Sequence, residues 1–199
     1  MAEAAPDETS ERAKYEAMWA REEYRRYSPG EALVGMAIEA LGIGPCDYVI
    51  DYGCGSGRAA QHLARVAAAV TAIDIAPNCL DPDVDVDFVT ACLWDLPPDI
   101  GPADIAFCAD VMEHIPPHKV SAVIESIAQH TTRGAFFQIS TVPDGCGKLI
   151  GQSLHLTVRP APWWHRQLGE HWAGVDCLAD GASAIFTCES SRSSLPIST

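Results

Sequence analysis

Apolar and polar positions alternate with helical spacing over the first part of the chain. Residues 11–27 place apolar and aromatic side chains at i, i+3 and i+4, which predicts a helix. A second helix is predicted over residues 29–41, because Pro29 suits a first helical turn and the apolar side chains share one face. The glycines at positions 42 and 44 are expected to end it.

From residue 47 onward, short apolar runs alternate with helical segments. Strands are predicted at residues 48–51, 70–74, 87–91, 104–109 and 134–141, and helices at residues 57–69, 117–130 and 162–168. Two further β-prone runs flank Ala179-Asp180-Gly181, and an Asp-Gly pair between strands predicts a hairpin. The pattern predicts an α/β fold, a Rossmann-like doubly wound seven-stranded sheet that is mostly parallel, with an antiparallel C-terminal hairpin.

The 199 residues are expected to form one domain with additions at both ends. Residues 1–10 are expected to be disordered, and residues 11–44 to form N-terminal helices that could close over a site. Residues 45–189 would form the main domain, and residues 190–199 a flexible tail.

Composition and charge narrow the function classes. The formal net charge of −14 disfavours a nucleic-acid partner. The chain has no apolar run near the roughly 20 residues of a membrane span, and its first residues are acidic and polar, which predicts a cytoplasmic protein without membrane contact. The eight cysteines include no C-x-x-C pair, so free thiols and no metal site are expected.

The stretch VIDYGCGSG joins the first predicted strand to a helix. Gly53, Gly55 and Gly57 let the backbone approach a ligand closely, and the free N–H groups of the helix start would point at it. A P-loop would need a lysine after the glycines, and none follows. The dinucleotide fingerprint would need a glycine where Arg58 stands.

This stretch resembles the first motif of class I S-adenosylmethionine-dependent methyltransferases, in particular the small-molecule "type 11" group. Asp74 ends the strand TAIDIA, and the segment VMEHIPP resembles the family's run after the fourth strand. The resemblance covers about residues 47–189. It implies transfer of a methyl group from S-adenosyl-L-methionine to an O, N or C atom of a small-molecule acceptor, with S-adenosyl-L-homocysteine as product.

The resemblance also implies which residues bind the cofactor. They are Asp51, Gly53, Gly55, Gly57, Asp74, Leu93, Trp94 and Ala109. Asp74 would accept hydrogen bonds from ribose hydroxyls. Cys92 stands where the family often has an acid for the adenine amine, so backbone groups near Leu93, or Trp94, would hold the adenine instead. Trp94 could equally pack in the core.

Methyl transfer from a sulfonium depends mainly on positioning, and a base is needed only if the acceptor keeps its proton. The catalytic candidates are His114, Asp110 and His155, and the substrate-binding candidates are Tyr15, Trp19, Tyr27, Arg159, Trp163 and Trp164. The aromatic candidates could instead serve packing, and His114 could pack under the following helix.

Two other functions stay open at this point. The absence of an obvious base and the Cys92 departure would suit a non-catalytic S-adenosylmethionine-binding regulatory protein. An NAD-dependent oxidoreductase on a related sheet is disfavoured by Arg58 and by the terminal hairpin. Nucleic-acid amino-methyltransferases carry an Asn/Asp-Pro-Pro-aromatic motif after the fourth strand, and this chain has Ala109-Asp110-Val111-Met112 there.

Overall fold

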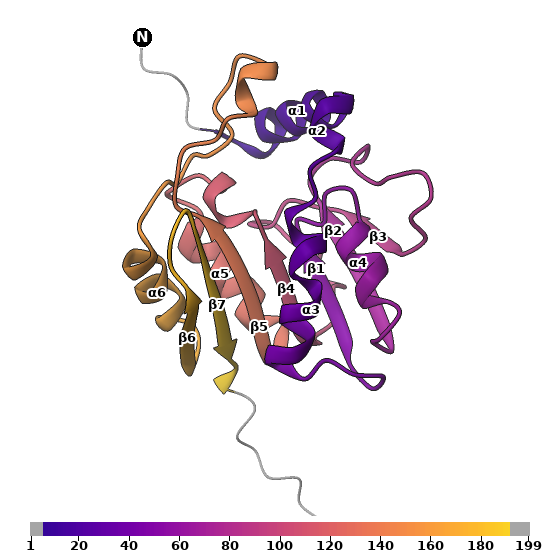
Figure 1. The fold of residues 1–199 in the computed structure, drawn as a ribbon, viewed down its shortest axis with the longest axis vertical. Helices are drawn as coiled ribbons and strands as arrows, with labels where there is room; N and C mark the ends of the chain where they lie inside the picture. Colours follow the sequence, from indigo (N-terminus) through magenta and orange to yellow (C-terminus); the bar gives the residue numbers. More distant parts are fainter. Residues whose placement is uncertain (1–5, 192–199) are drawn as a thin grey trace, which may run out of the picture.

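The computed structural model describes residues 6–191, which form a seven-stranded sheet between two layers of helices (Figure 1). The strands are β1 (Tyr48–Tyr52), β2 (Ala69–Asp74), β3 (Asp87–Thr90), β4 (Ala103–Ala109), β5 (Thr131–Ser140), β6 (Gly174–Ala179) and β7 (Ser183–Glu189). Their order is β3-β2-β1-β4-β5-β7-β6. Strands β1 to β5 pair in parallel, while β7 pairs antiparallel with both β5 and β6. The predicted fold class is confirmed.

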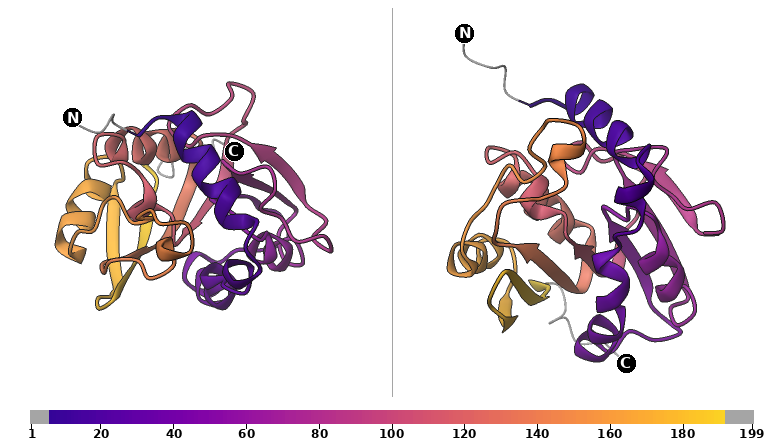
Figure 2. Two further views of the ribbon diagram at one scale, coloured as in Figure 1. Left: turned by 90° about the horizontal axis from the view of Figure 1, so that it is seen from above. Right: turned by 45° about the horizontal axis from the view of Figure 1, so that its top comes forward.

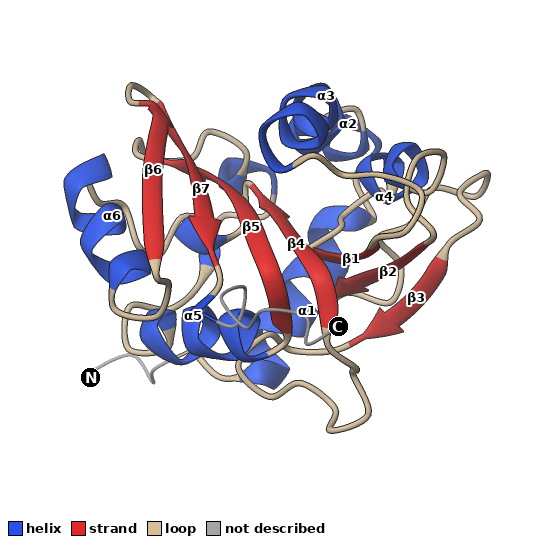
Figure 3. Ribbon diagram, turned by 90° about the horizontal axis from the view of Figure 1, so that it is seen from below, coloured by secondary structure: helices blue, strands red, loops and turns tan. Residues whose placement is uncertain are grey.

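The α-helices are α1 (Glu8–Trp19), α2 (Glu22–Arg25), α3 (Pro29–Leu41), α4 (Arg58–Leu63), α5 (Val120–Gln129) and α6 (Ala161–Gly169), with short 3-10 turns at Met112–His114 and Gly147–Leu149. Helices α3 and α4 lie on one face of the sheet, and α5 and α6 lie on the other (Figure 3). One apolar core lies between the sheet and α3 and α4, and the other between the sheet and α5 and α6. A sheet buried on both faces explains why its strands read as nearly continuous apolar runs.

Helices α1 and α2 lie across the carboxyl ends of the parallel strands (Figure 2). The long connection from β5 to α6 reaches the same edge of the sheet. Ligands of open α/β sheets bind in the crevice outside the carboxyl ends of the strands. The fold therefore places its N-terminal helices and its longest loop at the edge where a ligand site is expected.

Several predicted boundaries differ in the structure. Helix α1 begins at Glu8, because the Asp7 carboxylate accepts the Ser10 N–H and the Ser10 hydroxyl contacts the Asp7 N–H in a capping box. The prediction of disorder up to residue 10 is therefore wrong for residues 8–10, while residues 1–5 lie outside the described residues. The single helix predicted over residues 11–27 is broken between α1 and α2.

The helix predicted over residues 57–69 ends at Leu63. At the other end of the chain, the expected flexible tail falls mostly on residues 192–199, which lie outside the described residues. Within residues 6–191, no helix combines the length and apolar character needed to cross a bilayer.

Candidate functional site

The glycine loop runs from the end of β1 to the start of α4 and makes two close backbone contacts. Gly53 has φ 73° and Gly55 has φ 52°, in the region that favours glycine. A Cβ on Gly55 would lie 2.8 Å from the Trp19 ring, and one on Gly53 would overlap Val111. The loop is therefore pressed between α1 and the turn after β4, and side chains at these positions would disrupt it.

Asp51 lies in the buried part of β1, next to its last residue, and is only 2% exposed. Its Oδ2 atom has no hydrogen-bond partner within the described part of the chain. Burial, together with the charge of Asp74, raises the pKa of Asp51 to about 7, although the Ala60 N–H opposes this. Because a buried carboxylate oxygen normally has a partner, Asp51 is suited to receive a cationic or hydrogen-bond-donating ligand.

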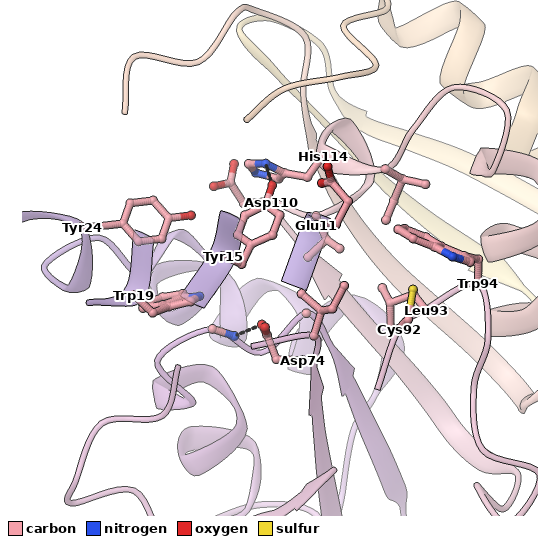
Figure 4. Close-up of a pocket in the computed structure, with 15 residues that line it drawn as sticks. Glu11, Tyr15, Trp19, Tyr24, Asp74, Cys92, Leu93, Trp94, Asp110 and His114 are labelled. Atoms are coloured by element: carbon pink, nitrogen blue, oxygen red, sulfur yellow. Dashed lines mark hydrogen bonds between the residues drawn. The ribbon is translucent and has the colours of Figure 1, made fainter. Parts of the chain in front are cut away.

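Asp74 connects the glycine loop to β2. Its Oδ2 accepts the Gly55 N–H at 3.0 Å (Figure 4). Its Oδ1 accepts the Ala76 N–H at 2.9 Å. Burial raises the pKa of Asp74 to about 6, and these two N–H groups lower it again in part. Each carboxylate oxygen keeps a further lone pair, so Asp74 can hold the loop and still accept a hydrogen bond from a ligand.

Two connected cavities lie at this edge of the sheet. The first has a volume of about 100 Å³ and lies among α1, the glycine loop, Asp74 and the segment Cys92-Leu93-Trp94. The second has a volume of about 300 Å³ and extends from Asp51 and the start of α3 to the loop of residues 142–155. The residues that line both are Trp19, Tyr24, Gly53, Gly55, Asp110 and His114. The two spaces therefore meet between the glycine loop and the turn after β4.

Aromatic side chains of α1 and α2 cover the first cavity. The Tyr15 hydroxyl lies 2.7 Å from His114 Nδ1, and Trp19 packs edge-on against Tyr24 with ring centroids 4.8 Å apart (Figure 4). Arg25 donates to the Cys79 carbonyl oxygen at 2.9 Å, which ties α2 to the segment after β2. These contacts hold α1 and α2 at the first cavity, and the lid role of these helices stays a prediction.

Two carboxylates lie in the turn that follows β4. Asp110 has φ 61°, a conformation that few residues other than glycine adopt, and its N–H donates to the Gln138 carbonyl oxygen. Glu113 is 0% exposed; its Oε1 accepts the Ser140 N–H at 2.5 Å, and its Oε2 has no partner among the described residues. Burial, with the Asp110 charge adding to it, raises the pKa of Glu113 well above its usual range.

Two imidazoles face each other beside these carboxylates. The rings of His114 and His155 are perpendicular, with centroids 4.8 Å apart. Burial lowers the pKa of His114 to about 4, so its imidazole is neutral at pH 7. The loop that carries His155 is fixed to the 3-10 turn, since the Glu113 carbonyl oxygen accepts the N–H groups of Leu156 at 2.8 Å and Thr157 at 2.9 Å.

Most of the residues predicted from the sequence meet at this site. Those that line one or both cavities are Asp51, Gly53, Gly55, Asp74, Leu93, Trp94, Ala109, Asp110, His114, His155, Tyr15, Trp19 and Tyr27. Trp94 is partly buried and faces the first cavity from the side opposite Trp19 (Figure 4). Gly57 lines neither cavity and instead provides the N-cap of α4 with φ 78°.

Three substrate-binding candidates lie elsewhere, which corrects the prediction made for them. Trp164 is 0% exposed in the core under α6, Trp163 packs edge-on against it at 4.8 Å, and the Arg159 guanidinium lies over Trp163. None of the three lines either cavity. Ala161, Trp164 and Leu168 share the buried face of α6, so the tandem tryptophans seat this helix on the sheet.

Neither Glu113 nor Asp144 was assigned a role from the sequence. Glu113 is part of the VMEH run, but nothing in the pattern showed that its side chain is buried. Asp144 accepts the N–H groups of Gly147 at 2.6 Å and Leu154 at 2.9 Å, and so shapes the loop that carries His155. Its place in a Pro-Asp-Gly turn was the available signal.

Comparisons with known proteins agree with this geometry. A family model described as "Methyltransferase domain" matches residues 12–186. Ubiquinone biosynthesis O-methyltransferase from Xanthomonas oryzae pv. oryzae is 33% identical over 103 residues, which cover 47% of this chain and 42% of that protein. The enzyme of the same name from Xylella fastidiosa is 32% identical over 103 residues, covering 47% and 41%. The match thus spans less than half the length of these curated relatives.

Solved structures with the same fold include methyltransferases with bound ligands. Magnesium protoporphyrin IX methyltransferase from Synechocystis PCC 6803 with bound SAM has a TM-score of 0.68 and 20% identity, covering 96% of this chain and 100% of that one. The N-methyltransferase NodS from Bradyrhizobium japonicum WM9 in complex with S-adenosyl-l-homocysteine has a TM-score of 0.65 and 14% identity, covering 91% and 98%. At these identities the likeness shows the shared fold.

Proposed function

Because this chain belongs to the methyltransferase-domain family, we propose that it transfers a methyl group from S-adenosylmethionine to a hydroxyl oxygen of a small molecule. The family predicted from the sequence is confirmed, which sets the oxidoreductase alternative aside. The choice of oxygen rests on the curated relatives, which are named as O-methyltransferases. A small acceptor is supported by the net charge of −14, which disfavours a nucleic acid. A cytoplasmic location stays a prediction.

The observation that carries the proposal is the unpartnered Oδ2 atom of Asp51 beside the glycine loop. S-adenosylmethionine carries an ammonium group at its methionine end, and a buried carboxylate without a partner is suited to bind it. In this placement the ribose hydroxyls would lie near Asp74, and the adenine among Cys92, Leu93 and Trp94. The glycine-loop backbone would then lie along the middle of the cofactor.

The acceptor would bind in the part of the second cavity that Asp110, His114 and His155 line. Methyl transfer is an in-line displacement at carbon, in which the acceptor oxygen forms its bond to the methyl group as the sulfur–methyl bond breaks. The protein contributes chiefly by holding the two molecules in line and by excluding water. Asp110, His114 and His155 line this cavity, and we assign them to the acceptor side.

Calorimetric titration of the full chain with S-adenosylmethionine, S-adenosylhomocysteine and NAD tests the cofactor. We expect saturable binding of the two adenosyl ligands and none of NAD. Asp51→Asn should weaken S-adenosylmethionine binding by about 2 to 3 kcal/mol, roughly 30- to 150-fold, because it removes one partner of a buried charge pair. Asp85→Asn is the matched control, since Asp85 is exposed and lines neither cavity.

The acceptor is tested by incubating the protein with S-adenosylmethionine and a panel of phenols, catechols and amines, followed by mass analysis of the products. Methylation at a hydroxyl group would support the proposal. A folded wild-type protein that binds no adenosyl ligand would contradict the cofactor, and exclusive methylation of amines would contradict the oxygen acceptor.

A further inference from the structure

We propose that Glu113, His114 and His155, with Asp110 beside them, form a binding site for one divalent metal ion at the wall of the acceptor cavity. Its use in catalysis rests on the proposed function, whereas its ability to bind a metal does not. The site joins the 3-10 turn after β4 to the loop after β5, so it is assembled only in the folded chain.

The distances between possible ligand atoms fit a single ion. Glu113, His114 and His155 each offer one ligand atom, and these atoms all lie within 4.8 Å of one another. Metal–ligand bonds of about 2.0 to 2.2 Å place neighbouring ligand atoms roughly 3 to 4.4 Å apart. Small side-chain movements would therefore bring all three into one coordination sphere.

The buried carboxylate provides the second observation. One oxygen of Glu113 is fixed by the Ser140 N–H, and the other, Oε2, is buried and has no partner among the described residues. Asp110 stands three residues earlier in the same turn. Because a buried carboxylate oxygen normally has a partner, the unpartnered Oε2 of Glu113 is suited to bind a cation.

The two histidines are oriented as metal ligands usually are. Nδ1 of His155 lies 2.7 Å from the Val142 carbonyl oxygen, which can only accept, so a proton belongs on this Nδ1 and the lone pair is left on Nε2. Nδ1 of His114 lies 2.7 Å from the Tyr15 hydroxyl and 3.2 Å from the Leu154 carbonyl oxygen. A proton on this Nδ1 is compatible with both contacts, because a hydroxyl oxygen can accept as well as donate, and it leaves the Nε2 lone pair for a metal. Such a hydrogen bond from the second nitrogen is typical of metal-binding histidines.

A competing cluster near the glycine loop is less suited to a metal. Cys54, Asp74 and Cys79 also bring ligand atoms within 4.8 Å of one another. Both oxygens of Asp74, however, already accept backbone N–H groups. Glu113 differs because one of its oxygens has no such partner.

The donor set indicates the kind of ion. Imidazole nitrogen favours zinc, iron and neighbouring transition metals, while carboxylate oxygen also suits manganese. An ion here could bind the acceptor hydroxyl and lower its pKa. The O–H bond would then break with release of the proton to solvent before the O–CH₃ bond forms and S-adenosylhomocysteine leaves.

Metal binding is tested without reference to activity. Chelator-treated full-length protein is titrated with Mn²⁺, with free Mn²⁺ followed by electron paramagnetic resonance, and with Zn²⁺ by calorimetry. We expect one saturable site in the wild type for at least one of the two ions. Binding should weaken at least tenfold in His155→Gln and in Glu113→Gln. The matched control is His118→Gln, because His118 is exposed and outside the cluster.

The variants are chosen to keep the fold. A glutamine at position 113 can still accept the Ser140 N–H, and His155 lies at the cavity edge. If Glu113→Gln fails to fold by circular dichroism, His155→Gln alone decides. The proposal is overturned if the wild type binds neither ion, or if His155→Gln binds as tightly as His118→Gln.

Titration of the same preparations with S-adenosylmethionine separates the two proposals. Cofactor binding with no binding of either ion would overturn the metal site and leave the proposed function standing. Metal binding that His155→Gln weakens, with no cofactor binding, would support the site and contradict the function.

Discussion

Two regions of this molecule carry tryptophans next to arginines, and only one of them forms part of the site. On α1 and α2, Trp19 lies beside Arg25, whose guanidinium is 5.7 Å from the ring, and it lines both cavities. On α6, Trp163 and Trp164 lie beside Arg159, but Trp164 is wholly buried in the core. From the sequence, the tryptophans of both regions were candidates for substrate binding.

The difference follows from where each segment lies on the sheet. Helices α1 and α2 cross the carboxyl ends of β1, β2 and β4, where backbone groups and Asp51, Asp74 and Asp110 are available to a ligand. Helix α6 packs against the side of the antiparallel strands β6 and β7, where its aromatic face meets other apolar side chains. Both regions combine tryptophan with arginine, and the topology decides which of them lines the site.

Replacing Trp164 by Ala should have the largest effect, and on stability alone. Removing a fully buried indole loses its burial and leaves a cavity, so the free energy of unfolding should fall by about 3 to 5 kcal/mol. Urea denaturation measures this change. In the folded fraction, the dissociation constant for S-adenosylmethionine should equal that of the wild type. A clear loss of affinity would show that α6 contributes to cofactor binding.

Trp19→Ala is the counterpart at the other region. Trp19 is 7% exposed and contacts Gly55, so it should enclose a bound cofactor. We expect its removal to weaken S-adenosylmethionine binding by about 2 kcal/mol, roughly thirtyfold, mainly through faster dissociation. Stopped-flow fluorescence or calorimetry measures it. Trp163→Ala is the control. If both changes weaken S-adenosylmethionine binding equally, the two tryptophan regions do not differ in their contribution to the site.

The fold could be predicted from the sequence because its signals are local. The apolar runs of the parallel strands, the Asp-Gly hairpin and Pro29 at the start of α3 each act within a few residues, and each is confirmed. The capping box at Asp7 and the end of α4 at Leu63 were missed, because each depends on the hydrogen bonds of one helical turn.

The site could be predicted only in part. The cofactor-binding residues could be predicted, since Asp51 and the glycines are neighbours in sequence. The cluster of Glu113, His114 and His155 depends on the packing of a loop onto the 3-10 turn. No spacing rule shows that two segments 40 residues apart meet, as the Leu154 carbonyl oxygen and His114 Nδ1 do here. The sequence therefore predicted no metal site.

The pH dependence of cofactor binding should distinguish Asp51 from acids outside the site. Burial and the charge of Asp74 raise its pKa to about 7, so the free protein holds Asp51 protonated below that pH. A neutral carboxyl group cannot pair with the ligand's ammonium. The ionised fraction rises from about 0.1 at pH 6 to about 0.75 at pH 7.5, so affinity should rise roughly eightfold. Calorimetry at these pH values measures it, and Asp51→Asn should remove the rise.

Asp51 also determines whether the ligand-free protein gains or loses stability as the pH rises. A folded-state pKa above the ordinary value near 4 means that the folded form binds more protons than the unfolded form between about pH 4 and pH 7. The contribution of Asp51 is therefore fully present at acid pH and is lost as pH rises through 7. Asp74, with its pKa raised to about 6, acts in the same direction. The thiols of Cys54 and Cys108 also face Asp51. Above pH 7, Asp51→Asn should be more stable than the wild type.

The smallest effect is expected where the N-terminal helix meets the acceptor side. The Tyr15 hydroxyl and His114 Nδ1 are 2.7 Å apart, and this hydrogen bond joins α1 to the turn after β4. Tyr15→Phe keeps the ring and its edge-on packing against His114 but loses about 1 kcal/mol of hydrogen bonding. If α1 closes over the bound cofactor, this loss should appear as dissociation about fivefold faster, with little change in association. Stopped-flow kinetics with Tyr27→Phe as control measures it, because Tyr27 is 61% exposed. An unchanged dissociation rate would mean that the Tyr15–His114 contact does not hold α1 over the ligand, and that Trp19 and Arg25 suffice to keep this helix in place.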